Sequence, residues 1–139
     1  TPALVACIIA PGNRSHELVR RSGECVINLP ASHLIDTVTG IGNTSGRDID
    51  KFAHFGLTAV DGDVVQAPLI VQCHANFECR LHDDTLVDRY GLFVWEVVKA
   101  HVAVSPKVPE TIHYRGDGQF MVSGRQVSRR RAFRPEMLP

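Results

Sequence analysis

The chain has 139 residues and carries 15 basic and 15 acidic side chains, so its formal net charge is zero. This length indicates one domain, and a content of 44% hydrophobic against 22% charged residues excludes a disordered chain. The balanced charge argues against nucleic acid as the main partner, because binding to a phosphate backbone needs a basic excess.

Membrane and secreted classes are disfavoured as well. No apolar run approaches the roughly 20 residues that a membrane-spanning helix needs, and no signal peptide is visible. The four cysteines, at positions 7, 25, 73 and 79, form no C-x-x-C pair and have no zinc-ligand spacing. Free cysteines usually behave as small buried apolar residues and fit a reducing compartment. We therefore expect a cytoplasmic protein without a metal site.

The beginning of the chain predicts a strand followed by a helix. Residues 3–10 are continuously apolar and rich in β-branched types, which predicts a strand buried on both faces. A helix is expected over residues 15–22, with Asn13 or Ser15 as its cap and Gly23 just after its end.

Further short elements follow in the first half. Residues 24–29 predict a second strand, ended by a proline. A weak helix with a serine cap is expected over residues 32–39, and another over residues 48–55 with Asp48 as its cap. The Gly-rich segment 40–47 between them is expected to be a loop.

The second half is rich in predicted strands. Residues 75–82 alternate between apolar and polar types, the period of a half-buried strand. Residues 92–101 are nearly apolar at first, which suits a central strand or a dimer contact, and an acidic loop separates the two strands. A hairpin of residues 119–123 and 126–129 is then expected around Gly124. These elements predict an antiparallel β domain with two or three short helices.

Two polar segments have the composition of anion-binding loops. Each combines short polar side chains with a cation, and the first opens a helix, where unpaired N–H groups favour negative charge. The residues are Asn13, Arg14 and Ser15 in the first segment and Ser45, Gly46, Arg47, Lys51 and Phe52 in the second. Read singly, they also fit an ordinary capped helix and a solvated surface loop. The second segment is neither a Walker A loop nor a dinucleotide fingerprint.

Histidine residues offer weaker signals. His101 ends the strongest strand, where a histidine is usually structural but can also protonate or position a cofactor. The pair Cys73-His74 lacks the partners of a metal site, and structural burial is the favoured interpretation of its thiol. The segment 115–118 is interpreted as a turn.

Taken together, the motifs resemble the flavin reductase-like family of FMN-binding split barrels. Each motif alone is weak, but their order and spacing extend over essentially the whole chain. The matching segments are 13–15, 23–30, 45–46, 50–52, 56–57, 67–70, 78–80, 96–98 with His101, and 113–118.

The resemblance implies a single domain over residues 1–139 that is mainly β with short helices, an FMN-binding split β-barrel of Greek-key type. It implies a homodimer that binds FMN near the subunit interface and transfers hydride from NADH or NADPH to flavin, with a partner monooxygenase or another electron acceptor. Two strands that open the family's fold are expected before Thr1, so the natural protein is expected to be longer.

The resemblance also assigns roles to residues. Asn13, Arg14 and Ser15 match the helix start that binds the phosphate, and His101 matches a position near the nicotinamide. Ser45, Gly46 and Lys51 match the second flavin-contacting loop, and Arg47 and Phe52 beside them are counted with the cofactor-binding residues. His101 is therefore the candidate catalytic residue. Two alternatives stay open: an FMN-dependent oxidoreductase that acts on another small molecule, and a non-enzymatic flavin- or haem-binding module.

Overall fold

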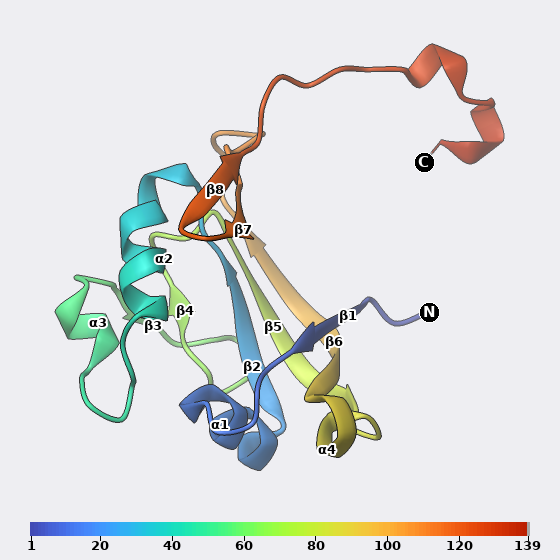
Figure 1. The fold of residues 1–139 in the computed structure, drawn as a ribbon. Helices are drawn as coiled ribbons and strands as arrows, with labels where there is room; N and C mark the ends of the chain where they lie inside the picture. Colours follow the sequence, from blue (N-terminus) through green and yellow to red (C-terminus); the bar gives the residue numbers. More distant parts are fainter. Residues whose placement is uncertain (139) are drawn as a thin grey trace.

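A computed structural model describes residues 1–138 and consists mainly of antiparallel β structure (Figure 1). The main sheet is curled and has four strands in the order β1-β6-β5-β2, and two small two-stranded ladders accompany it.

The strands are β1 Leu4–Ile8, β2 Glu24–Leu29, β3 Ala59–Val60, β4 Leu69–Ile70, β5 Ala75–Asp83, β6 Leu92–Val102, β7 Ile112–Gly116 and β8 Gln119–Val122. The helices are α1 Arg14–Ser22, α2 Ile35–Gly42, α3 Lys51–His54 and α4 Val87–Tyr90, with short 3-10 turns η1 Ser32–Leu34, η2 Arg130–Ala132 and η3 Pro135–Met137. The predicted fold class, mainly β with short helices, is confirmed.

The core lies on one face of the main sheet. Cys79, Val87, Phe93 and Trp95 are buried there, and the rings of Phe93 and Trp95 stack with 5.5 Å between their centroids. The apolar run that begins at Leu92 therefore forms a central strand, β6, which pairs with β1 on one side and with β5 on the other.

The first strand differs from its prediction. β1 is an edge strand that pairs only with β6, and its residues alternate between exposed and half-buried. Ile8 is 72% exposed and Leu4 is 49% exposed. The expectation of burial on both faces is wrong, because Leu4, Ala6 and Ile8 share one face of β1 and that face is exposed in the described part of the chain.

Strand β5 is more deeply buried than its alternating pattern predicts. Asn76 and Glu78, on its polar face, are 8% and 0% exposed. The carboxylate of Glu78 accepts hydrogen bonds from the backbone N–H groups of Asp63 (3.0 Å), Val64 (2.7 Å) and Val65 (2.8 Å). The segment that carries these donors covers the polar face around Glu78, so both faces of the first half of β5 are shielded from water, whereas Arg80, His82 and Asp83 farther along are exposed.

The helices between β2 and β3 begin and end at other residues than predicted. α2 continues through Gly42, so the first part of the expected loop is helical, while the cap of α3 is Asp50 rather than Asp48. The Asp50 carboxylate accepts from the N–H groups of Phe52 and Ala53. Gly40 is needed inside α2, because a Cβ there would lie 2.4 Å from Cε1 of Phe55.

The expected hairpin around Gly124 is also wrong. β7 pairs with β8 across a tight turn at Asp117 and Gly118, whose φ angles of 51° and 69° are the positive values that a two-residue hairpin turn requires. Residues 124–138 then leave the sheet as a segment that ends in the two 3-10 turns η2 and η3 (Figure 1). Of the helices in residues 1–138, none combines the length and the apolar character needed to cross a bilayer.

Candidate functional site

A hollow of about 890 Å³ lies between the start of α1, the end of α2 and the loop that leads into α3. It is lined by all eight residues that the sequence proposes for ligand binding: Asn13, Arg14, Ser15, Ser45, Gly46, Arg47, Lys51 and Phe52. The two polar segments are more than 25 positions apart in the chain and yet share one hollow, which the sequence pattern of either segment alone could not reveal. We call this the first hollow.

The N-terminus of α1 forms one wall of the first hollow. Gly12 has a φ of 92°, which only glycine adopts readily, and Asn13 is extended before the helix begins. No side chain caps this helix, so neither Asn13 nor Ser15 acts as the predicted cap. The first-turn N–H groups and the positive end of the helix dipole are thus available to a negatively charged ligand.

Ionic contacts join the two walls. Glu17 in α1 binds Nη1 of Arg14 at 3.1 Å and also pairs with the guanidinium of Arg47. Arg47 donates in addition to the carbonyl of Gly12 at 2.9 Å. The hydrogen bond from Arg14 and the nearby Arg47 lower the pKa of the Glu17 carboxyl, although burial acts in the opposite direction. Both guanidinium groups are therefore fixed at the rim of the hollow by one carboxylate.

The opposite wall of the first hollow, formed by the end of α2 and the loop that leads into α3, is held by hydrogen bonds of its own side chains. Nζ of Lys51 donates to the carbonyl of Ile41 at 2.7 Å near the end of α2, and Oγ1 of Thr44 donates to the carbonyl of Gly40 at 3.0 Å. Oγ of Ser45 accepts from the N–H of Arg47 at 3.1 Å. The loop is thus held by its own polar side chains, and it brings an ammonium group and two hydroxyl groups to the hollow.

This donor set suits a phosphate-bearing ligand. A phosphate dianion is bound by backbone N–H groups, hydroxyl groups and one or two cations. The first hollow supplies each of these, with three cations (Arg14, Arg47 and Lys51) against the carboxylate of Asp50 in its lining and Glu17 beside it. Leu18 and Phe52 add apolar surface for the remainder of such a ligand.

His101 does not line the first hollow. It extends from β6 over the polar face of β5, where its Nε2 donates to the Glu78 carboxylate at 2.6 Å. Asp63, Glu78 and His101 bring ligand atoms within 4.8 Å of one another, a spacing that could hold a cation. The oxygens of Glu78 already accept from three backbone N–H groups and from His101, so the arrangement serves to anchor the turn at residues 63–65.

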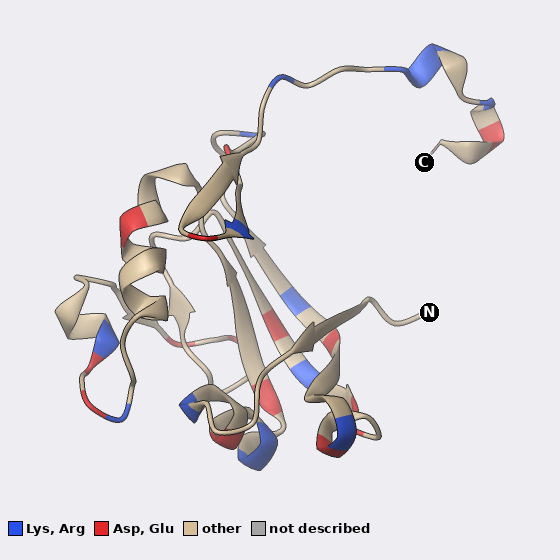
Figure 2. Cartoon of the chain, in the orientation of Figure 1, with Lys and Arg blue, Asp and Glu red and all other residues tan. Residues whose placement is uncertain are grey.

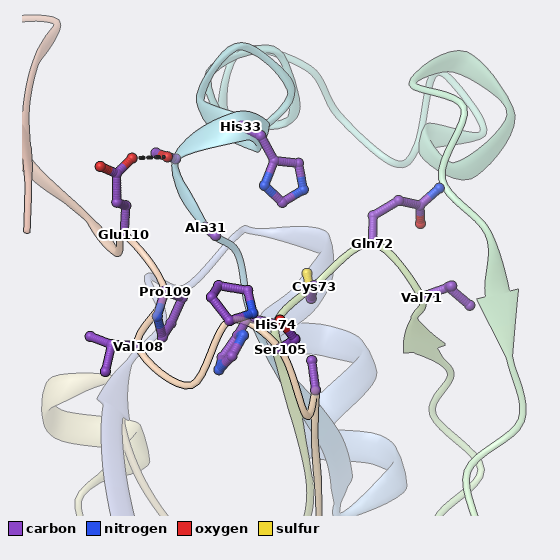
Figure 3. Close-up of a pocket in the computed structure, with 13 residues that line it drawn as sticks. Ala31, His33, Val71, Gln72, Cys73, His74, Ser105, Val108, Pro109 and Glu110 are labelled. Carbon is purple, nitrogen blue, oxygen red and sulfur yellow. Dashed lines mark hydrogen bonds between the residues drawn. The ribbon is translucent and has the colours of Figure 1, made fainter.

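A second hollow, of about 510 Å³, was missed by sequence reasoning. It lies where β2 ends, β5 begins and β6 runs into residues 103–110. In Figure 3, His33 comes from one segment and the neighbouring residues Cys73 and His74 from another, and Glu110 accepts a hydrogen bond from Ser32 at 2.9 Å. The only sequence signal was the pair Cys73-His74, since the other lining residues come from separate loops.

Three of the four thiols are poor nucleophiles. Burial raises the pKa of Cys25 to about 12, and it also raises the pKa values of Cys73 and Cys79. Thiolates, not thiols, attack electrophiles. These cysteines therefore serve as packing residues rather than as activated nucleophiles.

At pH 8 we expect Cys25 in the native protein to react with iodoacetamide at least about a hundredfold more slowly than Cys25 in the urea-unfolded protein. In the native protein only a small fraction of this thiol is ionised, and its side chain is packed against its neighbours. Mass spectrometry of the alkylated peptides measures the rate for each cysteine separately. None of the four cysteines is exposed, so none can serve as a reference for a freely reacting thiol, and glutathione added to the same reaction takes that role. Equal rates for native and unfolded Cys25 would contradict the prediction.

Comparison of the sequence with those of known proteins finds relatives of this chain. The chain is 31% identical to the uncharacterized protein YddH of Escherichia coli, over 91% of this chain and 74% of that protein. It is 32% identical to an uncharacterized protein of Archaeoglobus fulgidus, over 70% of this chain, and spans only about half (55%) of the length of that relative.

Solved structures share the fold at low identity. Flavoredoxin of Desulfovibrio vulgaris (Miyazaki F) superposes with a TM-score of 0.82 at 19% identity, over 93% of this chain and 74% of that one. An FMN-binding protein of Thermus thermophilus with bound p-hydroxybenzaldehyde gives 0.78 at 22% identity, over 91% and 73%. An NADH:FAD oxidoreductase of Streptomyces globisporus gives 0.73 at 18% identity, over 89% and 70%.

The model of the family described as the flavin reductase like domain matches residues 1–120. This match includes the main sheet, both walls of the first hollow and the β7–β8 turn. The chain belongs to the flavin reductase-like family.

Proposed function

We propose that this protein binds FMN in the first hollow and acts as an NADH- or NADPH-dependent flavin reductase or as a flavoredoxin-like electron carrier. The observation that carries the proposal is the convergence of the uncapped N-terminus of α1 with Arg14, Arg47 and Lys51 in one hollow. Membership of the flavin reductase-like family and the flavin-binding relatives of the same fold support it.

The residues present fit the phosphate end of FMN. Asn13, Ser15 and the first-turn N–H groups of α1 would donate hydrogen bonds, and the cations of Arg14, Arg47 and Lys51 would balance the dianion. Glu17 orients both arginines before the ligand arrives, because its two oxygens hold one guanidinium each. A bound flavin supplies the hydride and electron chemistry, while the protein supplies binding, orientation and electrostatics. No protein nucleophile is needed, in agreement with the raised thiol pKa values.

The remaining expectations belong to the same proposal. The physiological acceptor is a partner monooxygenase or another electron acceptor, and the protein acts as a homodimer in the cytoplasm. The four free cysteines support a reducing compartment. The assignment of His101 as a catalytic residue stays a prediction; its ring contacts the carboxylate of Glu78, and it is not among the residues that line the first hollow.

A second candidate function is FMN-dependent reduction of a small carbonyl compound, with NADH or NADPH as the source of the hydride. The second hollow favours it, because this space of about 510 Å³ brings imidazole, thiol and hydroxyl groups together with apolar walls. A pocket with a few polar groups among apolar ones is typical of small-molecule sites. The Thermus relative with its bound aldehyde belongs to the same fold.

The deciding experiment is an absorption titration. The purified protein is loaded with FMN and desalted, and NADH or NADPH is added without oxygen while absorbance near 450 nm is followed. We expect a retained yellow chromophore that is bleached by at least one of the two donors. Retained FMN that neither donor bleaches would exclude the reductase in favour of a carrier or binding module, and failure to retain FMN would exclude the binding proposal. Repeating the assay with p-hydroxybenzaldehyde, following its consumption, tests the second candidate.

A further inference from the structure

A buried histidine follows directly on Ser15, which lines the first hollow. His16 is the third residue of α1 and is only 9% exposed. Its ring lies edge-on against the ring of Phe93, with 5.3 Å between the two centroids. Phe93 is fully buried and stacks on Trp95, so the ring of His16 reaches the core of the domain.

This ring carries an unpaired polar atom. Nε2 of His16 is shielded from water, and none of the described residues forms a hydrogen bond with it. A buried polar atom without a partner is destabilising and rare in native structures. An apolar ring would fill the same space without that cost, so packing alone does not account for the imidazole. What distinguishes histidine from an apolar ring is its charge, which changes between pH 5 and 8.

The backbone of the same residue belongs to the turn that faces the first hollow. The N–H of Glu17 donates to the carbonyl of Asn13 at 3.4 Å, which is the first helical hydrogen bond of α1. The N–H groups of residues 14–16 precede this bond, and a helix leaves such groups without a partner inside the helix. His16 therefore has an N–H group in the anion-binding turn and a ring that holds this turn on the sheet.

Charged groups of α1 and α4 lie near the ring, at the end of the sheet where both helices carry basic and acidic positions (Figure 2). Asp88 of α4 is 81% exposed and binds Arg20, one turn farther along α1 than His16. The hydrogen bond and the charge of Arg20 lower the pKa of the Asp88 carboxyl most, burial acts in the opposite direction, and the charge of His16 lowers it further. Asp84 in turn acts on Arg20. A charged His16 therefore has its counter-charge at the exposed Asp88, whereas β6 presents only the apolar ring of Phe93 to it.

Resting on the proposed function, we propose that His16 positions the phosphate-binding turn of α1 and makes flavin binding depend on pH. With a neutral ring, His16 packs on Phe93 and holds Arg14 and the N–H groups of the first turn at the first hollow. A proton on the ring brings a charge into an apolar space, which is unfavourable. The ring then leaves Phe93 for Asp88 and water, and the first turn of α1 moves with it. The site is complete while His16 is neutral and is lost as the pH falls through the range in which histidine gains its proton.

Hydrogen–deuterium exchange of α1 tests this mechanism without flavin. In the wild type, the protection factors of the amides in residues 14–22 should fall at least about tenfold between pH 7.5 and pH 5.5, relative to the amides of β6. They should fall less than about twofold in His16→Phe, which keeps a ring against Phe93 but cannot be charged. His16→Leu replaces this variant if the larger ring prevents folding. The matched control is His113→Phe, at an exposed histidine of β7, which should keep the wild-type response.

The dissociation constant for FMN is then measured at both pH values by quenching of flavin fluorescence. A phosphate monoester gains its second proton at about pH 6, which weakens binding equally in every variant. Between the two pH values, the wild type and His113→Phe should lose at least about fivefold more affinity than His16→Phe.

Two results would overturn the role of His16 and leave the proposed function standing. One is unchanged protection of α1 in the wild type at both pH values, and the other is an equal pH dependence of FMN binding in the wild type and His16→Phe. Failure of every variant and of the wild type to bind FMN at pH 7.5 would instead contradict the proposed function, and with it the role of His16 at that site.

Discussion

Replacing Glu78 by glutamine is expected to lower the free energy of unfolding by about 3 kcal/mol, since a hydrogen bond to a charged group is worth roughly 1.5–3 kcal/mol and a buried donor left without a partner is destabilising. The amide of glutamine has a similar shape but offers only one acceptor oxygen. It would place N–H donors against those of Val64 and Val65, which the carboxylate now satisfies. Urea unfolding followed by the fluorescence of Trp95, the only tryptophan, measures the loss.

Glu96→Gln is the matched control for this prediction. Its carboxylate lies on the neighbouring strand β6 but is 43% exposed and has only a distant contact with His82, at 4.0 Å. We expect a change below about 0.5 kcal/mol, as for most surface positions. Equal stabilities of the Glu78 and Glu96 variants would show that the anchored turn contributes nothing to folding.

The same carboxylate makes the stability depend on pH. Burial alone would raise the pKa of Glu78, but hydrogen bonds from His101 and the backbone of residues 63–65 outweigh it and lower the pKa from 4.5 to about 2. A carboxyl whose pKa is lower in the folded state stabilises the fold above its unfolded pKa. The difference in stability between wild type and Glu78→Gln should therefore be full above about pH 4.5 and shrink as the pH falls toward 2.

Removing the polar side chains at the start of α1 is expected to weaken the binding of FMN far more than the binding of riboflavin. In the double variant Asn13→Ala with Ser15→Ala, the dissociation constant for FMN should rise at least about tenfold, because hydrogen bonds to a charged group are each worth roughly 1.5–3 kcal/mol. Riboflavin lacks the phosphate, so its affinity should change less than about twofold. Quenching of flavin fluorescence measures both constants on the same protein samples.

The control is a double variant in the second hollow, His33→Ala with Ser105→Ala, which removes two polar groups from that lining. FMN affinity should stay near the wild-type value. If this control weakened FMN binding while the α1 variant did not, the phosphate would belong in the second hollow. Equal losses for FMN and riboflavin in the α1 variant would instead place the ring, not the phosphate, at Asn13 and Ser15.

Sequence patterns predicted the elements that depend on local composition. The apolar run from Leu92 predicted the central strand, and Gly23 after a short amphipathic segment predicted the left-handed end of α1. The residues of the first hollow could be selected because each polar segment adjoins a helix start. Composition alone could not predict which ligand these residues bind, since the same residue types also fit an ordinary capped helix. The expectation of FMN came only from the resemblance to the family.

The sequence-based predictions that were wrong concern features set by contacts between distant segments. Glu78 alternates with apolar neighbours and so predicts an exposed position, but residues 63–65 fold over it. The turn that closes the last hairpin could have been at either of two glycine-containing sites. The structure uses Asp117-Gly118, which places Tyr114 opposite Phe120, with 5.1 Å between the ring centroids. The turn at residues 115–118 was predicted from its composition and is confirmed, whereas the folding of residues 63–65 over Glu78 has no local signal that composition or periodicity could reveal.

Gly40 is not among the residues that line the first hollow, but it lies directly behind one of its walls. With only a hydrogen at this position, the ring of Phe55 lies against α2, and a Cβ there would be 2.4 Å from Cε1 of that ring. Phe55 directly follows α3, the helix that brings Lys51 and Phe52 to the hollow. A side chain at position 40 is therefore expected to push on the end of this helix, so the wall of the hollow depends on a packing contact that no bound ligand would touch.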